Sequence, residues 1–394
     1  MLTWVAPIIV FGLVVFVHEL GHFIAAKLVG VYAPRFSIGF GPALLRRRVG
    51  ETEYVLAALP LGGYVRMASR EDEATAFLEG GSENSATHPG AKDEWDPNAM
   101  IPFGPKPIPE ARWFESKPLI ARLFIMLAGV TMNALLAYCI YAGLLLKSGL
   151  PTPIPVAAVV SPGKPAAAAG IQPGDSIATL NGRPLKQWDM LLDSIGASAG
   201  RPLTLGIVRQ GRPLEVRVTP IAESVPDPRT GVKRTLGRIG MVASEGFTPI
   251  SAGEALAQAW SLTIDNGSKI FSALGALVHG VGVSDLGGPI AIAQVSVQAA
   301  RGGIETLLLL VALISINVAV FNLLPIPILD GGQILLNVAE TIKGSAFSTQ
   351  TRERILKGGL LIIGLLFVTV MFNDISRNMQ NIVRLLGRLF GRSA

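Results

Sequence analysis

The sequence has little charge and a single cysteine. Charged residues make up 16% of its 394 residues, against about a quarter in a typical soluble domain. Half of the residues are hydrophobic and the mean hydropathy is +0.48, which argues against an ordinary cytosolic enzyme. The lone Cys139 excludes an intramolecular disulfide framework and a cysteine-rich zinc finger. Because the net charge of +6 is modest and scattered among apolar segments, we expect a membrane protein without a nucleic-acid partner.

Four apolar segments are long enough, or nearly so, to cross a hydrocarbon core that takes about 20 residues. The expected spans are 1–30, 119–147, 304–332 and 355–376. Lysine and arginine are frequent just after the first span and between the third and fourth, so the positive-inside rule assigns both loops to the cytoplasm. A basic tail, 377–394, argues against this orientation. The expected fold class is an α-helical polytopic membrane protein, embedded in the lipid bilayer by about four transmembrane helices.

The segments between these spans differ in composition. Residues 31–70 contain strand-like stretches broken by a double glycine. Residues 71–118 are rich in Glu, Ser, Gly and Pro, which predicts a flexible cytoplasmic loop. Residues 150–243 alternate short strands with turn signals and predict a small α+β domain, in which 203–208 and 214–218 form a hairpin around Gln210-Gly211. Residues 250–300 predict an interfacial helix and a loop.

The first span carries the motif His18-Glu19-Leu20-Gly21-His22. Histidines four residues apart lie on one face of a helix, so both imidazoles can bind one metal ion, with Glu19 beside the attacking water. A pair of hydrogen-bonded core histidines is the alternative. Ionisable groups inside a membrane span are costly and usually functional, so the motif predicts a metal site.

A catalytic zinc ion typically has three protein ligands, so a third ligand is needed at similar depth. Asp330 directly follows the uncharged stretch 306–329 of the third span, whereas Glu340 lies farther into a polar loop and Asp374 follows the fourth span. Pro325 and Pro327 unwind the chain near Asp330, and irregular backbone at membrane depth is tolerated only where it is buried or lines a wet cavity. Asp330 is therefore the predicted third ligand.

Several motifs together resemble the site-2 protease family, and its bacterial RseP-type members in particular. They are HELGH on the first span, FNLLPIPILDGG on the third, and a region between the second and third spans, SPGKPAAAAGIQPGDSIATLNGRPL, that resembles a PDZ domain. FSIGFGPAL and LPLGGYVRM resemble the family's membrane-associated β-hairpin, and SKPLIARLFIMLAGVTMN resembles its second span. The resemblance covers nearly the whole chain. It implies a zinc-dependent intramembrane endopeptidase with one catalytic ion.

The resemblance also implies roles for individual residues. His18, His22 and Asp330 would be the zinc ligands, Glu19 the catalytic base, and Asn317 and Asn322 would lie near the active site. Asn322 could donate to the oxyanion or satisfy backbone groups freed by the following prolines, and both roles stay open. The sequence departs from many family members at three points: Val130 replaces a proline, Gln333 replaces a histidine or arginine, and there is room for only one PDZ domain.

A transmembrane helix must unwind before its peptide bonds become accessible. Segments 36–41 and 53–66 could hold the unwound substrate as an added strand, with Gly62 and Gly63 allowing a close approach of its backbone. A purely structural hairpin is the alternative, since glycines also serve bulges and turns.

The family implies substrates that cross the membrane once, such as anti-sigma factors or remnant signal peptides. It implies a bacterial cytoplasmic (inner) membrane, with the active site near its cytoplasmic side and the PDZ-like domain outside. That domain would gate access by size, or dock a peptide or an exposed C-terminus; a spacer without ligand is the alternative. Two other functions remain: a membrane-anchored PDZ scaffold with a vestigial metal site, and a metal transporter.

Overall fold

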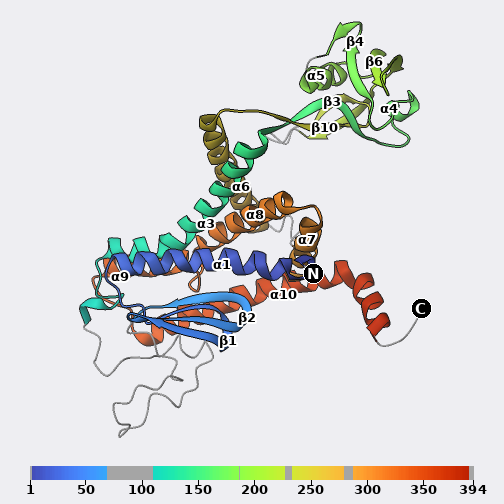
Figure 1. Cartoon of the computed structure of the whole chain (residues 1–394). Coiled ribbons are helices and arrows are strands. Elements are labelled where there is room, and N and C mark those ends of the chain that lie inside the picture. The colour runs from blue at the N-terminus through green and yellow to red at the C-terminus, as the bar shows by residue number, and fades with distance from the viewer. Residues whose placement is uncertain (1, 69–109, 186, 227–232, 279–286, 390–394) are drawn as a thin grey trace. The chain divides into compact units, whose positions relative to one another are not determined.

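A computed structural model describes residues 2–68, 110–185, 187–226, 233–278 and 287–389 (Figure 1). The chain forms two compact units. The first contains Met1–Gly143 and Leu256–Ala394, and the second contains Leu144–Ala255. Residues 71–109 of the expected flexible loop lie outside the described residues.

Helices dominate the first unit. Within the residues that the structure describes, four helical segments are long and apolar enough to cross a membrane, judged by length and composition: Val5–Leu28, Leu119–Ser148, Ile304–Asn322 and Gln350–Arg377. They belong to α1 (Leu2–Leu28), α3 (Leu119–Ser148), α8 (Ile304–Asn322) and α10 (Thr349–Leu389). The shorter or more polar helices are η2 (Glu110–Arg112), α6 (Ala252–Val278), α7 (Pro289–Arg301) and α9 (Asp330–Lys343). Helix α10 continues through the fourth expected span into the predicted basic tail.

The third expected span, 304–332, contains a helix followed by the predicted unwound segment before Asp330. Helix α8 ends at Asn322 and α9 begins at Asp330. Pro325 and Pro327 lie between them, and proline lacks the N–H that continues a helix and disfavours helical backbone in the residue before it. The break therefore follows from the sequence and leaves Asp330 at the start of a new helix.

The apolar core of the first unit contains residues of α1 and of α8, which lie far apart in the sequence. Ala6, Val10 and Val14 of α1 recur at four-residue spacing and are at most 1% exposed. They pack with Leu307, Val311 and Ile314 of α8. One stripe of α1 is thus held against α8, which fixes the helix that carries both histidines.

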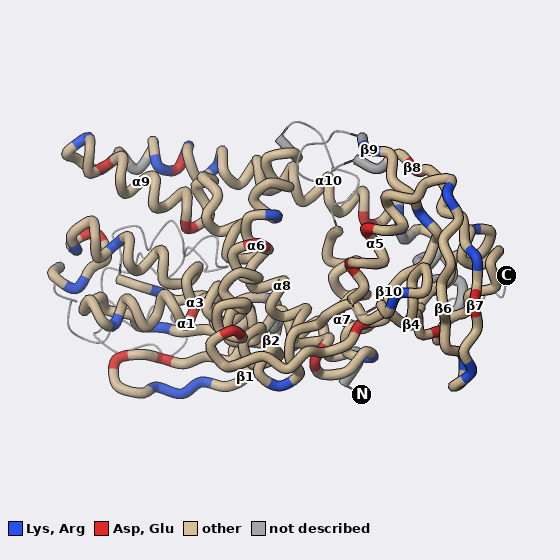
Figure 2. The backbone as a smooth tube through the Cα atoms, turned by 90° about the horizontal axis from the view of Figure 1, so that it is seen from above, with Lys and Arg blue, Asp and Glu red and all other residues tan. Residues whose placement is uncertain are grey.

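Strands β1 (Arg35–Val49) and β2 (Thr52–Arg66) form a sheet in which each long strand folds back on itself. The N-terminal part of β1 pairs with two different parts of β2: Ser37 lies opposite both Val55 and Tyr64. The sheet therefore consists of four short segments in the order 63–66, 35–38, 53–56 and 45–48. Figure 2 shows a blue stretch of lysine and arginine beside the label β1, whose sequence includes Arg46, Arg47 and Arg48.

The second unit is strand-rich. Its main sheet has the order β10-β3-β4-β6-β7, with β5 added to β4, and β8 and β9 form a separate pair. The elements are β3 (Leu150–Val160), α4 (Pro165–Ala168), β4 (Ser176–Leu180), β5 (Arg183–Pro184), α5 (Trp188–Ala197), β6 (Leu203–Arg209), β7 (Arg212–Val218), β8 (Ile221–Pro226), β9 (Lys233–Arg238) and β10 (Met241–Thr248).

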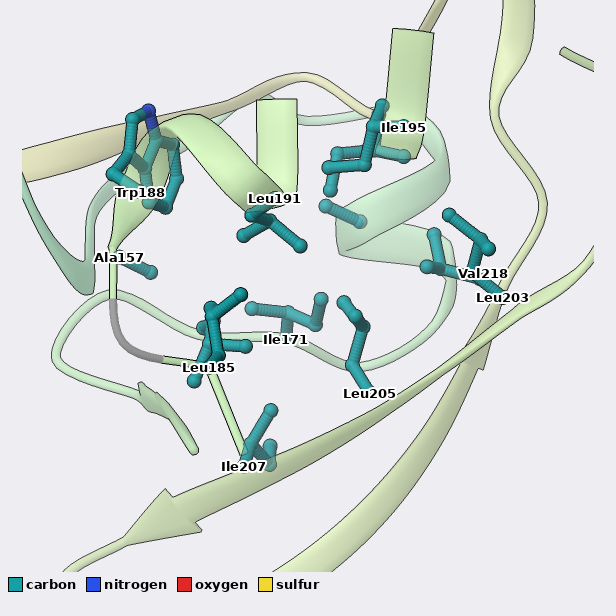
Figure 3. Packing of buried hydrophobic residues seen from close by; sticks show 13 residues of the cluster. Ala157, Ile171, Leu185, Trp188, Leu191, Ile195, Leu203, Leu205, Ile207 and Val218 are labelled. Atoms are coloured by element: carbon teal, nitrogen blue, oxygen red, sulfur yellow. The ribbon is translucent and has the colours of Figure 1, made fainter. Parts of the chain in front are cut away.

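Helix α5 covers the core of this unit. Trp188, Leu191 and Ile195 face inward at helical spacing and pack with Leu205 and Ile207 of β6 (Figure 3). The predicted hairpin of β6 and β7 is confirmed. Its turn residues, Gln210 and Gly211, have positive φ values of 49° and 79°, as a two-residue hairpin turn requires.

Candidate metal centre

Two imidazoles meet on one face of α1. His18 and His22 are each 7% exposed, and their Nε2 atoms lie 3.1 Å apart. The four-residue spacing brings the rings together because one helical turn takes 3.6 residues. Both side chains thus direct one nitrogen into the same small space.

Asp330 completes the cluster from the start of α9. Its Oδ2 lies 3.2 Å from His18 Nε2 and 3.4 Å from His22 Nε2. The two glycines that follow Asp330 let α9 pack closely against the turn before it. A Cβ on Gly331 would lie 2.3 Å from Leu323 O, and one on Gly332 would lie 2.0 Å from Ile326 O. The glycines are required because α9 begins directly against the proline-containing turn.

Gln333, where many family members have a charged residue, also holds this turn. Its Nε2 donates a hydrogen bond of 2.8 Å to Pro327 O. The departure from the family pattern therefore leaves a polar side chain that binds the turn before Asp330.

The two rejected carboxylates have other partners. Glu340 forms an ion pair with Arg352 and accepts a hydrogen bond from Phe347 N. Asp374 is 1% exposed and accepts hydrogen bonds from the N–H groups of Ile290 and Ala291, in the first turn of α7. Both carboxylates are used structurally, which agrees with the choice of Asp330.

The cluster fits a metal ion. Ligand atoms about 2.0–2.2 Å from a tetrahedral zinc ion lie roughly 3.3–3.6 Å from one another, close to the observed 3.1, 3.2 and 3.4 Å. Asp330 Oδ2 is buried and accepts no hydrogen bond from the described residues. A buried carboxylate oxygen without a donor is costly unless a cation binds there.

Helix α3 packs against the two histidines. His22 Nδ1 donates a hydrogen bond of 2.8 Å to Ile125 O, which leaves Nε2 free to bind a metal. The backbone of α3 comes so near that a Cβ on Gly129 would lie 2.4 Å from His22 Nε2. On α1, a Cβ on Gly21, the residue before His22, would lie 2.5 Å from Ala128 O. The helices approach this closely because glycine faces the partner at both points.

Glu19 lies between the metal cluster and the sheet. Its Oε2 accepts a hydrogen bond of 3.1 Å from Val65 N, in the edge segment 63–66. A Cβ on Gly63 would lie 3.4 Å from Glu19 Cγ and 2.7 Å from Ser37 O. The sheet therefore reaches the carboxylate directly.

The other predicted site residues lie at different distances from the cluster. Asn322 Nδ2 is 3.2 Å from His18 Nε2, so this side chain belongs to the cluster. Asn317 lies in α8 and is half-buried, but within the described part of the chain it makes no hydrogen bond to the three ligands. Gly62 has a φ of +131°, and a Cβ there would lie 2.4 Å from the Phe40 ring rather than near Glu19.

An apolar cavity lies between α1 and the sheet. Its volume is about 580 Å³, and its lining includes Phe16, Leu20 and Phe23 of α1 together with Phe36 and Ile38 of β1. Leu20 follows Glu19 in the chain. The helix surface next to the carboxylate is therefore apolar and partly open.

The sequence reasoning missed three supporting groups. The Ile125 carbonyl and the Val65 N–H are backbone atoms, which no side-chain pattern identifies. The third group, Asn133, lies 3.5 Å from His18 Nδ1 through its Nδ2. Its signal was present, because Asn133 is a strongly polar residue in an uncharged span, but the depth and face of that span were unknown.

Paired histidines with a nearby carboxylate and an adjacent glutamate are typical of a metallopeptidase site. The profile of Peptidase family M50 matches residues 6–366. The chain therefore belongs to Peptidase family M50 and is a metalloendopeptidase, which confirms the resemblance to site-2 proteases.

Curated relatives agree with this assignment. The Regulator of sigma-W protease RasP of Bacillus subtilis is 31% identical, over 95% of this chain and 98% of the relative. The zinc metalloprotease RasP of Geobacillus kaustophilus is also 31% identical, over 94% of this chain and 97% of the relative. Both similarities extend over almost the full length of each protein.

Proposed function

We propose that this protein is a zinc-dependent protease that cleaves peptide bonds within membrane-spanning segments, with one zinc ion held by His18, His22 and Asp330. The observation that carries the proposal is the triangle of 3.1, 3.2 and 3.4 Å between their ligand atoms. Two imidazoles and one carboxylate are a donor set that zinc uses in catalytic sites. The name of the Geobacillus relative, a zinc metalloprotease, supports the choice of metal.

Glu19 is the proposed general base. Zinc, when bound, lowers the pKa of a water molecule and polarises the scissile carbonyl group. Glu19 takes the proton of the attacking water and returns it to the leaving amine. Before substrate binds, Val65 N donates a hydrogen bond to one oxygen of this carboxylate and leaves the other oxygen open.

Asn322 is the proposed oxyanion donor. Its amide nitrogen lies 3.2 Å from His18 Nε2, on the metal side of that ring, so it can reach an oxygen that develops charge there. This contact supports the catalytic role over the alternative of satisfying backbone freed by Pro325. Asn317, one and a half helical turns earlier, is proposed to contact substrate rather than the reacting atoms.

The sheet is the proposed holder of the unwound substrate. Residues 63–66 form one edge and pair with 35–38 on one side only, and a free edge can accept another strand. Gly63 lies within reach of Glu19, and Gly62 precedes it at a bend with positive φ. A substrate strand on this edge would run past the general base.

The proposed substrates are proteins that span the membrane once, such as anti-sigma factors or remnant signal peptides. The Bacillus subtilis relative is a regulator of sigma-W protease by name, which supports the first class. We assign the protein to a bacterial inner membrane, with the site near the cytoplasmic side, because Arg46–Arg48 and the basic loop before α10 follow the positive-inside pattern.

The second unit is proposed to act as an extracytoplasmic PDZ-like module that controls access. Strand β10 ends the sheet order and pairs with β3 alone, so its other edge can accept an extended peptide or a C-terminus. Val242 and Phe247 of β10 are 56% and 58% exposed. Apolar side chains along this edge support docking of a peptide.

The function is tested with the full chain in liposomes that contain a panel of single-span helices. Wild type should cut one or more helices within the apolar segment, as product masses reveal. Glu19→Gln should retain zinc and lose about 10²–10⁴-fold in rate, the typical contribution of general acid–base catalysis. Glu353→Gln changes an exposed glutamate of α10 and should behave as wild type.

Three results contradict the proposal. If Glu19→Gln cleaves as fast as wild type, Glu19 is not the general base, and if wild type cleaves no helix, the alternative of a membrane-anchored scaffold is supported. If the cuts fall only in soluble flanking residues, the protein is a metalloprotease but not an intramembrane one.

A further inference from the structure

Asn133 is a buried polar residue that the proposed mechanism does not use. It lies in α3 and is 0% exposed. Its backbone carbonyl accepts a hydrogen bond of 2.9 Å from Ser315 Oγ of α8. This contact ties Asn133 to α8, so its amide has a fixed position next to His18 of α1.

The two histidines differ in how their second nitrogen is supported. His22 Nδ1 donates to the Ile125 carbonyl, the usual arrangement for a metal-binding imidazole. The corresponding atom of His18, Nδ1, lies 3.5 Å from Asn133 Nδ2. Within the described residues, Asn133 is the group that meets this nitrogen.

The position of the proton on a metal-bound imidazole decides whether Asn133 must donate or accept a hydrogen bond. When Nε2 of a neutral histidine binds a metal, the ring proton is on Nδ1, which then needs an acceptor. Asn133 Oδ1 is buried and has no hydrogen-bond partner among the described residues. A half-turn of the amide exchanges Nδ2 and Oδ1 with almost no change in shape and presents the oxygen to His18 Nδ1.

We propose that Asn133 is a positioning residue whose amide oxygen accepts a hydrogen bond from Nδ1–H of His18 and holds that ring with Nε2 toward the metal. The inference rests on the proposed zinc site. It gives His18 the same kind of support that Ile125 gives His22. An amide suits a buried position better than a carboxylate because it accepts without carrying a charge into an apolar span.

Outer partners of metal-binding histidines typically contribute 10–100-fold to metal affinity. Asn133→Leu, which keeps the branching of the side chain and removes the acceptor, should therefore weaken zinc binding by about 10–100-fold. Asn133→Asp retains an acceptor and should bind zinc more tightly than the leucine variant. Ser315→Ala removes the neighbouring hydrogen bond without touching the imidazole, so its zinc affinity should match wild type even if its melting temperature falls.

The measurement is a zinc titration of the full-length protein in detergent, in competition with a chromogenic chelator. The inference is overturned if Asn133→Leu binds zinc as tightly as wild type, or if Asn133→Asp is as weak as the leucine variant. Failure of wild type itself to bind zinc refutes the proposed function instead, so the two failures are distinguishable.

Proton NMR of histidine-labelled wild type provides a measurement that needs no stable variant. With zinc bound, the Nδ1–H of His18 should be a hydrogen-bonded, slowly exchanging proton, as should that of His22. Rapid exchange of the His18 proton, with slow exchange of the His22 proton, contradicts the proposed acceptor.

Discussion

Two aspartates, one from each unit of the molecule, have carboxylates with opposite surroundings. Asp175, in the strand-rich unit, is 1% exposed and receives hydrogen bonds from Arg209 and from Gln172 N. Asp330, in the helical unit, directs a buried oxygen without a hydrogen-bond donor at two imidazoles. One carboxylate is paired with an arginine, and the other lies against two imidazoles that could bind a metal ion together with it.

The difference separates a structural acid from a functional one. Hydrogen bonds from Arg209 lower the pKa of Asp175 below its ordinary value despite its burial, so its charge stabilises the folded state. Asp330 offers its charge to a ligand instead. Substitutions at the two positions should therefore change different measured quantities.

The largest expected effect is at Asp330. Asp330→Asn keeps the size of the side chain but removes a charged ligand, so zinc affinity should fall by more than the roughly 100-fold expected for an outer partner, and cleavage should be lost. The melting temperature of the metal-free protein should change little, because no protein hydrogen bond to Oδ2 is lost. Zinc content and a thermal melt in chelator check both. Full zinc occupancy of Asp330→Asn would contradict this prediction, because Asp330 would then matter no more for zinc binding than Asp175.

An intermediate effect is expected at Gly129. Gly129→Ala introduces a Cβ that would lie 2.4 Å from His22 Nε2, so α3 or the ring must shift and zinc binding should weaken by at least 10-fold. Gly143→Ala on the same helix, where a Cβ would meet nothing within 4 Å, is the matched control. Equal zinc affinity of the two variants would show that the close approach of α3 does not shape the site.

The smallest effect is at Asp175 and concerns stability alone. Asp175→Asn should cost about 2 kcal/mol in unfolding free energy near neutral pH, the usual scale for charged hydrogen bonds. Its zinc affinity should be unchanged. Denaturant unfolding, with exposed Glu215→Gln as the control, measures the difference.

The pH dependence of this stability difference follows from the lowered pKa of Asp175. The contribution of the carboxylate is complete above the ordinary aspartate value of about 3.9. It is lost as the pH falls through the lowered folded value. The gap between wild type and Asp175→Asn should therefore close in acid, and a gap that widens in acid contradicts the assigned pairing.

The sequence brings the three candidate metal ligands together because the constraints on them are local. The HExxH spacing follows from helical periodicity, and few carboxylates other than Asp330 lie near an apolar span. The supporting groups depend on how α1 and α3 cross, which no single helix encodes. Asn133 was visible as an isolated polar residue, but its neighbour was not.

The sheets show a similar limit. The turn at Gln210-Gly211 has a strong local signal, and the hairpin was predicted correctly. The double pairing of β1 with β2 depends on bends near Gly39 and Gly62, both with positive φ. Glycine permits such a bend but does not require one, so the order of the four segments could not be predicted.

The bond from Val65 N to Glu19 has a consequence for the resting enzyme. The same outward-facing amide that holds the glutamate is the one that an incoming strand would use to pair with the edge 63–66. Peptide arrival and release of the carboxylate would then be a single exchange of hydrogen bonds. Such a protease would not cleave neighbouring transmembrane helices that stay wound. Cleavage would begin only when an unwound chain pairs with the Val65 amide and displaces Glu19 from it.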